Sequence, residues 1–309
     1  MPAMRALLVV NPKATTTSAR SRDVLVRALR SEVSLELEYT QRRGHAAELA
    51  RQAVKEGMDV VVTLGGDGTI NEVVNGLLTD GPSEAVPALA VVPGGSTNVF
   101  AGALGLPRDW AEGTSVILEA LRERRTRTIG LGRANQRWFT FCAGMGFDAE
   151  VIRRVERARS QGRISTPALY LREALAQFAT TRDRRHPPMT LHRPGAEPIT
   201  GLAAIIVQNT SPWTYLGNRP INPSPGASFD LGLDAVAQRT LGISSTARTA
   251  FHLLSRTPPR GRRVVRLHDV DEFTLSSLLP QAYQLDGDYL GETDRIVFKS
   301  EPRALRVVC

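Results

Sequence analysis

The stretch Val61–Leu77, VVTLGGDGTINEVVNGL, constrains the fold of this 309-residue chain more than any other. It begins as a short, largely apolar run, passes through Gly65, Gly66 and Gly68 around Asp67, and continues as a helix-like stretch. A buried strand that leads directly into a helix is one half of a strand–helix–strand unit, and such units build parallel sheets. The stretch therefore predicts an α/β fold.

Short apolar runs and amphipathic runs alternate throughout the first hundred residues. The runs at Val60–Leu64 and Leu89–Val92 are almost continuously apolar, as expected of strands covered on both faces. This alternation predicts a three-layer α/β domain with a parallel sheet and right-handed crossovers. The predicted strands are Ala6–Val10, Leu35–Tyr39, Val60–Leu64 and Ala88–Val92, and the predicted helices are Ser18–Leu29, His45–Glu56, Thr69–Leu78, Thr97–Leu104 and Trp110–Arg124.

The pattern changes after residue 126. Strand-like pieces then dominate, and glycine and proline separate them at short intervals, which is typical of antiparallel β structure. One helical stretch, Ala149–Ala179, interrupts them and is broken near Gly162 and Pro167. The sequence therefore predicts an α/β domain followed by a mostly β domain, with a boundary near residue 128.

The cysteines and apolar runs suggest a compartment. Cys142 and Cys309 are too few and too far apart for a disulfide framework or a metal cluster, so a reducing environment is expected. The first apolar run is shorter than the core of a secretion signal, and no run approaches the ~18 apolar residues of a membrane span. We therefore expect a cytoplasmic protein that is soluble or peripheral to a membrane.

The formal charge of +8 is concentrated in two regions. Residues Val151–Arg185 contain nine arginines and only three acids, and a second cluster runs from Arg256 to Arg266. Basic surface attracts phosphate on nucleotides, nucleic acids or anionic lipids, although a solvated face is the alternative. The basic stretches lack interleaved aromatic residues, so we do not expect nucleic-acid binding.

The three glycines around Asp67 favour a phosphate site over a plain turn, which needs one or two glycines. Glycine lets the backbone approach a ligand closely, and the N-terminus of the following helix attracts an anion. The stretch is neither a Walker loop, since no lysine follows the last glycine, nor a Rossmann fingerprint, whose spacing differs. An acid beside a phosphate indicates Mg²⁺ coordination or the handling of a substrate hydroxyl.

Four successive predicted strands end in small, polar or cationic residues. Asn11 and Lys13 follow the first strand, Thr40 the second, Gly65–Gly68 the third, and Gly94–Asn98 the fourth. Because ligands of open parallel sheets bind at the carboxyl ends of the strands, these ends together predict a nucleotide site.

The motifs NPKA, LGGDGTINEVVNGL and PGGSTNVFAGALGLP resemble those of lipid kinases related to diacylglycerol kinase and sphingosine kinase. The resemblance is greatest to bacterial diacylglycerol kinase-like proteins, extends loosely to NAD kinases and phosphofructokinases, and continues at GMGFDAEV, ASFDLGLDAV and LDGD. It implies an ATP-binding α/β domain over residues 1–128 and a β-sandwich lipid domain over 129–293. It also implies that residues 294–309 pack back on the first domain.

The resemblance further implies which residues bind ATP. The run from Gly65 to Asn71 would form the phosphate loop, and residues from the other strand ends would add contacts. The implied set is Asn11, Lys13, Thr40, Gly65, Gly66, Asp67, Gly68, Thr69, Ile70, Asn71, Gly95, Ser96, Thr97 and Asn98.

The resemblance leaves three candidates for the catalytic base. Asp286-Gly287-Asp288 falls where many relatives have Asp-Gly-Glu, and a carboxylate there is thought to deprotonate the lipid hydroxyl in bacterial members. In sphingosine kinase-like members that role is assigned to the acid matching Asp67. Some bacterial members also hold a structural Mg²⁺ through an Asp-Asp-Gly stretch, where this chain has Asp230 followed by Leu231.

The expected function is therefore an ATP- and Mg²⁺-dependent lipid kinase that converts diacylglycerol to phosphatidic acid at an anionic membrane surface. Two alternatives remain: a soluble phosphotransferase of the NAD kinase type, and a non-catalytic regulator that binds nucleotide or lipid on the same fold. A homodimer is compatible with the resemblance, and nothing in the residues decides it.

Overall fold

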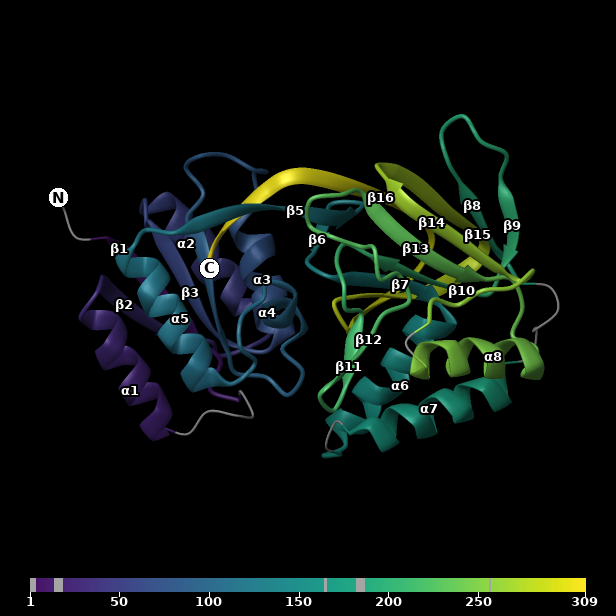
Figure 1. The fold of residues 1–309 in the computed structure, drawn as a ribbon, viewed down its shortest axis with the longest axis horizontal. Helices are drawn as coiled ribbons and strands as arrows, with labels where there is room; N and C mark the ends of the chain where they lie inside the picture. Colours follow the sequence, from purple (N-terminus) through teal and green to yellow (C-terminus); the bar gives the residue numbers. More distant parts are fainter. Residues whose placement is uncertain (1–3, 14–18, 164–165, 182–186, 256) are drawn as a thin grey trace. The chain divides into compact units, whose positions relative to one another are not determined.

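The computed structural model describes residues 4–13, 19–163, 166–181, 187–255 and 257–309, and the chain divides into two compact units (Figure 1). Unit 1 consists of Met1–Leu131 together with Pro302–Cys309, and unit 2 consists of Gly132–Glu301. The division lies three residues beyond the expected boundary at 128. The returning segment that joins unit 1 is shorter than the predicted 294–309.

Unit 1 is built on a parallel sheet with the strand order β4-β3-β1-β2. The end of the long strand β16 adds a further parallel strand beside β4, where Val307 pairs with Leu89. Every residue of β3 and β4 is buried, which explains why their sequences lack the alternation of a half-exposed strand. The strands are β1 (Arg5–Val10), β2 (Ser34–Tyr39), β3 (Val60–Gly65), β4 (Ala88–Pro93) and β16 (Asp288–Val308).

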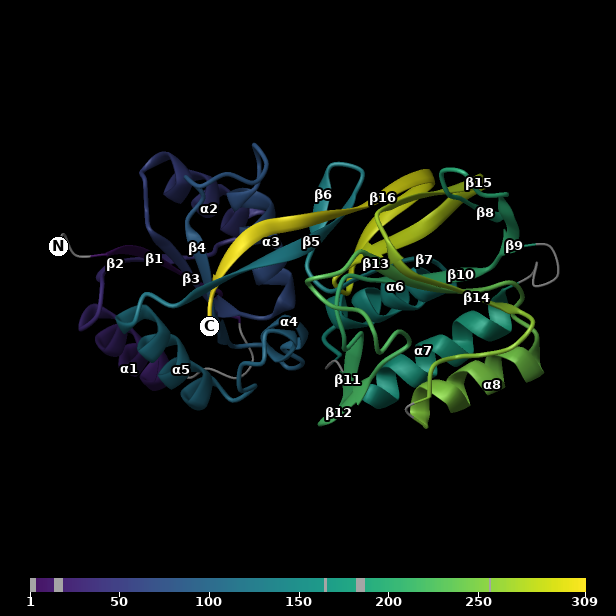
Figure 2. The same ribbon diagram turned by 45° about the horizontal axis from the view of Figure 1, so that its top comes forward.

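Helices cover both faces of this sheet, so unit 1 has three layers. Figure 2 shows α2 and α3 on one face and α1 and α5 on the other. The pair α2–α3 packs closely at Gly76, where a Cβ would lie 2.3 Å from the carbonyl oxygen of Ala47. The helices are α1 (Ala19–Arg30), α2 (His45–Lys55), α3 (Asp67–Leu77), α4 (Val99–Ala103) and α5 (Trp110–Arg122).

Unit 2 is rich in strands, and its main pairing path is antiparallel in the order β14-β13-β10-β7-β15-β16. Strand β8 pairs with the start of β15, and β9 with β8. The ranges are β7 (Cys142–Gly146), β8 (Met189–His192), β9 (Ile199–Leu202), β10 (Ala204–Gln208), β13 (Leu233–Gln238), β14 (Val264–Val270) and β15 (Glu272–Leu285). Smaller hairpins are formed by β5 (Thr126–Ala134) with β6 (Arg137–Phe139) and by β11 (Thr214–Leu216) with β12 (Arg219–Ile221).

The core of unit 2 is centred on three aromatic rings. Phe273 stacks on Phe298 with ring centroids 5.2 Å apart, and Phe139 meets Phe298 edge-on at 6.2 Å. All three side chains are fully buried among aliphatic residues from β7, β8, β10 and β13. These contacts fix the strands from which the polar groups of unit 2 extend.

In the part of unit 2 that the structure describes, the helices are α6 (Phe147–Ser160), α7 (Pro167–Thr180) and α8 (Ile243–Leu254). Helix α6 buries Ala149, and its Val155 and Ala158 form a small cluster with Leu169 that joins it to α7. Helix α8 lies beside α7 in both views (Figures 1 and 2) and has no buried residue. None of the helices in the described ranges is long and apolar enough to cross a membrane.

The prediction of a parallel α/β domain followed by a strand-rich region is confirmed. All four predicted strands of the first domain form within one residue of their expected limits, and the predicted break of Ala149–Ala179 separates α6 from α7. Some predicted features lie outside the described residues. These are the start of the first helix at Ser18, a part of the basic stretch Val151–Arg185, and Arg256 in the second basic cluster. Helix α8 was not predicted.

Candidate active site

The first part of the site is the turn between β3 and α3. Gly66 is the N-cap of α3 with extended backbone, and the N–H groups of Thr69 and Ile70 return to its carbonyl oxygen at 3.0 and 3.2 Å. The first N–H groups of α3, from Asp67 and Gly68, therefore lie at the positive end of the helix. This is the arrangement that binds phosphate at a helix N-terminus.

The second part is the turn after β4, which lies directly against the first. The N–H of Gly94 donates to the carbonyl oxygen of Gly65 at 3.0 Å. A Cβ on Gly95 would lie 2.6 Å from the Cα of Gly66, and one on Gly94 would lie 3.0 Å from the nitrogen of Gly65. Glycine is thus required because the two turns meet backbone to backbone, a reason that the sequence alone did not supply.

Asp67 connects the two turns. Its Oδ2 accepts the N–H of Val99 at 3.0 Å, and its Oδ1 accepts the N–H of Phe100 at 3.0 Å. These are the first N–H groups of α4, so the carboxylate caps that helix from the opposite turn. Both oxygens of Asp67 are engaged in holding the backbone, which favours a structural role over direct Mg²⁺ coordination or proton transfer.

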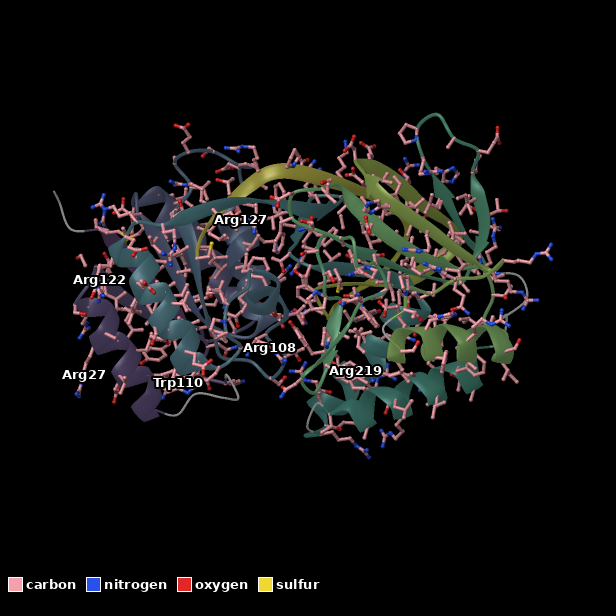
Figure 3. All side chains as sticks on the ribbon, in the orientation of Figure 1. Arg27, Arg108, Trp110, Arg122, Arg127 and Arg219 are labelled. Carbon is pink, nitrogen blue, oxygen red and sulfur yellow. The ribbon has the colours of Figure 1, made fainter. Side chains whose placement is uncertain are left out.

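Asn98 and Arg108 stabilise the second turn from within. Asn98 has left-handed backbone with φ of 50°, and its Oδ1 accepts the N–H of Gly95 at 2.9 Å. Arg108, labelled in Figure 3, donates from Nε to the carbonyl oxygen of Thr97 at 3.1 Å. Ser96 is exposed at the tip of this turn. Sequence reasoning selected Ser96, Thr97 and Asn98 but not Arg108, because the arginine lies outside the motif.

Asn11 connects the end of β1 to the first turn of α3. Its Nδ2 donates to the Thr69 hydroxyl at 3.0 Å, and its Oδ1 accepts the N–H of Lys13 at 3.0 Å. Thr40, at the end of β2, donates its N–H to the carbonyl oxygen of Val10 at 2.9 Å. Lys13 is exposed, so this edge carries a cation beside the neutral glycine turns.

Ile70 and Asn71, the last two residues of the expected phosphate loop, are buried. Ile70 is 1% exposed and Asn71 is 2% exposed, and Asn71 accepts hydrogen bonds from the Asn75 amide. Their side chains belong to the interior of unit 1. Glu72 has an unforeseen role, since its two oxygens accept the N–H groups of Gly44 and Ala46 at 2.8 and 3.3 Å and so cap α2.

Unit 2 has a candidate site of its own, at the hairpin turn between β15 and β16. Asp286 and Gly287 have φ of 50° and 83°, as a two-residue type I′ turn requires, and Leu285 pairs with Asp288 across it. The Asp286 carboxylate is buried. It accepts the N–H groups of Thr140, Phe141 and Cys142 and the Thr140 hydroxyl at 2.7–3.1 Å.

The surroundings of this turn separate the two candidate bases in unit 2. Four hydrogen bonds occupy the oxygens of Asp286, so it anchors the turn to the start of β7. Asp288 is the first residue of β16 and is only partly buried. Of the two, Asp288 has the exposure that contact with a substrate requires.

A second carboxylate lies behind the turn. Asp148, in the first turn of α6, accepts a hydrogen bond from Gln284 Nε2 at 3.0 Å. Burial raises the pKa of Asp148, and the hydrogen bond from Gln284 lowers it by a smaller amount. The net result is a pKa of about 6. Gln284 is 1% exposed, and its Oε1 accepts the N–H of Gly287 at 2.9 Å. Asp148 lies in the GMGFDAEV motif but was not selected from the sequence.

The predicted Mg²⁺ site at Asp230 finds no support in the described residues, among which no three His, Cys, Asp or Glu side chains are grouped to hold a metal. Asp230 is exposed, and Leu231 fills the place of the missing acid. The nearby Asp234 is buried and instead accepts the N–H of Asp269 and pairs with His268 Nδ1 at 2.8 Å. The donor set therefore does not fit a structural Mg²⁺.

Comparisons with known proteins show which family part of the chain resembles. Residues 5–134 match the family model of the diacylglycerol kinase catalytic domain. A diacylglycerol kinase from Bacillus subtilis is 40% identical over 104 residues, which cover 33% of this chain and 32% of that protein. A protein of Chromohalobacter salexigens named "Probable lipid kinase YegS-like" is 39% identical over 117 residues, which cover 38% and 36%.

The fold of the whole chain is also found among solved structures. That of a diacylglycerol kinase from Bacillus anthracis strain Sterne superimposes with a TM-score of 0.72 and 19% identity, covering 100% of this chain and 97% of that one. The family resemblance is thus confirmed over residues 5–134, and the likeness in fold extends beyond them. The matched segments span only about a third of the curated relatives' length.

Proposed function

We propose that this protein is a kinase that transfers the γ-phosphate of ATP to the hydroxyl of a lipid, with diacylglycerol as the acceptor and phosphatidic acid as the product. One observation carries the proposal: two glycine turns meet backbone to backbone at the carboxyl edge of a parallel sheet, beside the N-terminus of α3. A Cβ at Gly95 would collide with the Cα of Gly66 and force the two turns apart, and the neutral N–H groups of this glycine cradle suit the phosphate chain of a nucleotide.

The residues of the cradle would hold the phosphates, while Lys13 and the exposed Ser96 would add contacts from its rim. Phosphoryl transfer depends on positioning and charge neutralisation more than on covalent chemistry. The lipid hydroxyl oxygen would bond to the γ-phosphorus as the bond to the β-phosphate oxygen breaks, and ADP would leave. Asp288 would accept the hydroxyl proton, because it is partly exposed at the end of a turn that the buried Asp286 anchors.

We further propose that the protein acts while bound to the surface of an anionic membrane. Neighbouring helices α7 and α8 expose large apolar side chains, including Leu171 and Leu175 one turn apart and Phe251. Exposed arginines such as Arg163 and Arg248 accompany them. Apolar side chains that enter the interface, surrounded by cations that attract anionic headgroups, are the features of a peripheral membrane helix.

The activity is tested by incubating the protein with Mg²⁺ and ATP labelled at the γ-phosphate, and with a panel of lipids in mixed micelles. We expect label in phosphatidic acid from diacylglycerol, and loss of at least 100-fold in kcat for Asp288→Asn. Label in NAD alone would favour the soluble alternative. Tight ATP binding without transfer to any acceptor would favour the regulator, and either result would refute the proposal.

The membrane surface is tested separately by flotation with vesicles of phosphatidylglycerol or of phosphatidylcholine. We expect binding to the anionic vesicles only, and its loss in the double variant Leu171→Ser, Leu175→Ser. The same variant should phosphorylate a short-chain, water-soluble diacylglycerol at the wild-type rate. Unchanged flotation of the variant would contradict this surface.

A further inference from the structure

Helix α6 holds the backbone on both sides of Asp288. On one side, the N–H of Gly287 donates to Gln284 Oε1 at 2.9 Å, and Gln284 Nε2 donates to Asp148 on α6 at 3.0 Å. On the other side, the N–H of Tyr289 donates to Glu156 Oε1, also on α6, at 3.0 Å. The N–H groups of the residues before and after Asp288 are thus tied to one helix, the first through Gln284 and Asp148 and the second directly by Glu156.

The position of Asp148 is specified tightly. A Cβ on Gly144 would lie 2.0 Å from Asp148 Oδ2, so the absence of a side chain in β7 makes room for the carboxylate. Gln284 is buried between Asp148 and the turn, and its Nε2 also lies 3.9 Å from the sulfur of Cys142. Neither Asp148 nor Gln284 has a place in the proposed transfer step.

We propose that Asp148 and Gln284 are positioning residues that fix the orientation of Asp288, an inference that rests on the proposed function of Asp288 as the base. An ionised carboxylate only accepts hydrogen bonds, so Gln284 must direct its NH₂ group toward Asp148. Its carbonyl oxygen then faces the N–H of Gly287. If the amide flipped, two donors would face each other at Gly287, and the turn would lose its buried acceptor.

The proposal predicts that the orientation of Asp288 depends on which group donates and which accepts in these hydrogen bonds, more than on the identity of either residue. In Gln284→Glu, two carboxylates face each other, and nothing donates to Asp148. In the double variant Asp148→Asn, Gln284→Glu, the new amide donates to the new carboxylate, whose other oxygen still accepts the N–H of Gly287. Asp148→Asn alone keeps an acceptor and should disturb the turn little.

The experiment measures kcat and KM for diacylglycerol and ATP at pH 8, where Asp148 is ionised, together with exchange of the Gly287 amide proton by NMR in ligand-free protein. We expect Gln284→Glu to lower kcat at least 10-fold with KM for ATP unchanged and to accelerate exchange at Gly287. The double variant should return to within about threefold of wild type in both. Glu292→Gln is the matched control, because it removes an exposed pair between α6 and β16 with Arg153 and should leave both measurements unchanged.

Unchanged kcat and exchange in Gln284→Glu would overturn the inference, and so would failure of the double variant to recover. A melting temperature well above the assay temperature for each variant excludes simple unfolding as the cause. If wild-type protein phosphorylated no lipid, the proposed function would fail. Exchange at Gly287 across the same four proteins would then still decide whether Asp148 and Gln284 hold the turn.

Discussion

The contact between the two glycine turns makes a quantitative prediction for Gly95→Ala. A Cβ at this position would lie 2.6 Å from the Cα of Gly66, whereas a Cβ at Gly66 itself would lie 3.4 Å from the Cα of Gly95. Neither glycine has the left-handed backbone that disfavours alanine. The two substitutions therefore add the same methyl group to the same pair of turns and differ in how far they push the turns apart.

The expected cost follows from these distances. Carbon atoms in ordinary contact are about 3.5 Å apart, so Gly95→Ala must separate the turns by roughly 0.9 Å. This movement would break the hydrogen bond between Gly94 and Gly65, a loss of about 1 kcal/mol, and the strain of overpacking adds about 1–3 kcal/mol. If 1.4–2.8 kcal/mol of this appears in nucleotide binding, the Kd for ATP rises by about 10- to 100-fold.

Isothermal titration calorimetry with a non-hydrolysable ATP analogue measures this Kd directly. We expect the 10- to 100-fold increase for Gly95→Ala and an increase of at most threefold for Gly66→Ala. Equal losses in the two variants would refute the reasoning, because the distance between the turns would then not control binding. Wild-type affinity in Gly95→Ala would place the nucleotide elsewhere on the protein.

Three further outcomes test other parts of the structure. Gly76→Ala, whose Cβ would lie 2.3 Å from a carbonyl oxygen of α2, should lower the free energy of unfolding by about 1–3 kcal/mol, measured by urea denaturation, with the Kd for ATP unchanged. Asp286→Ala should cost at least about 3 kcal/mol in the same assay, because it leaves buried N–H groups of Thr140–Cys142 without their acceptor. Burial raises the pKa of Asp148 from 3.8 to about 6. The contribution of Asp148 to the free energy of unfolding is therefore most favourable below pH 3.8, and it is lost as the pH rises through 6. Asp148→Asn should therefore remove up to about 3 kcal/mol of destabilisation at pH 8 and flatten urea stability between pH 4 and 6, and an unchanged pH profile would contradict the shifted pKa.

The sequence predicted the fold of unit 1 well because local and tertiary signals coincide there. Strands β3 and β4 are apolar on both faces, so they could only be central strands, and the glycines that follow them mark the turns to α3 and α4. The spacing of apolar residues along a chain indicates which side chains are buried. In unit 1 the buried side chains are those between the sheet and the helices that cover it. The position of the glycine turns at the strand ends, where we propose that the phosphates bind, followed from the same pattern.

The sequence could not predict features that depend on long-range contacts. Helix α8 has no buried residue and exposes Ile243, Phe251 and Leu254, so its apolar side chains do not pack into the core on which the strand pattern of this region depends. Gln284 and Asp148 are 136 residues apart, and neither residue type at its own position indicates a contact with the other. Their hydrogen bond depends on the packing of α6 against β15, which the sequence pattern does not indicate.

The acids of the motifs show why residue type alone could not identify the base. Asp67 and Asp286 both occur beside glycines, which suggested chemistry, yet each uses its two oxygens to gather backbone N–H groups from a distant segment. A carboxylate that accepts several backbone hydrogen bonds has its charged form stabilised, so it is a poor proton acceptor but an effective anchor. The glycine turns and the Asp-Gly hairpin require such anchors, since their bare backbones have few side chains to fix them. Asp288 differs in lying directly after an anchored turn and being partly exposed, and this combination is the reason for proposing it as the base.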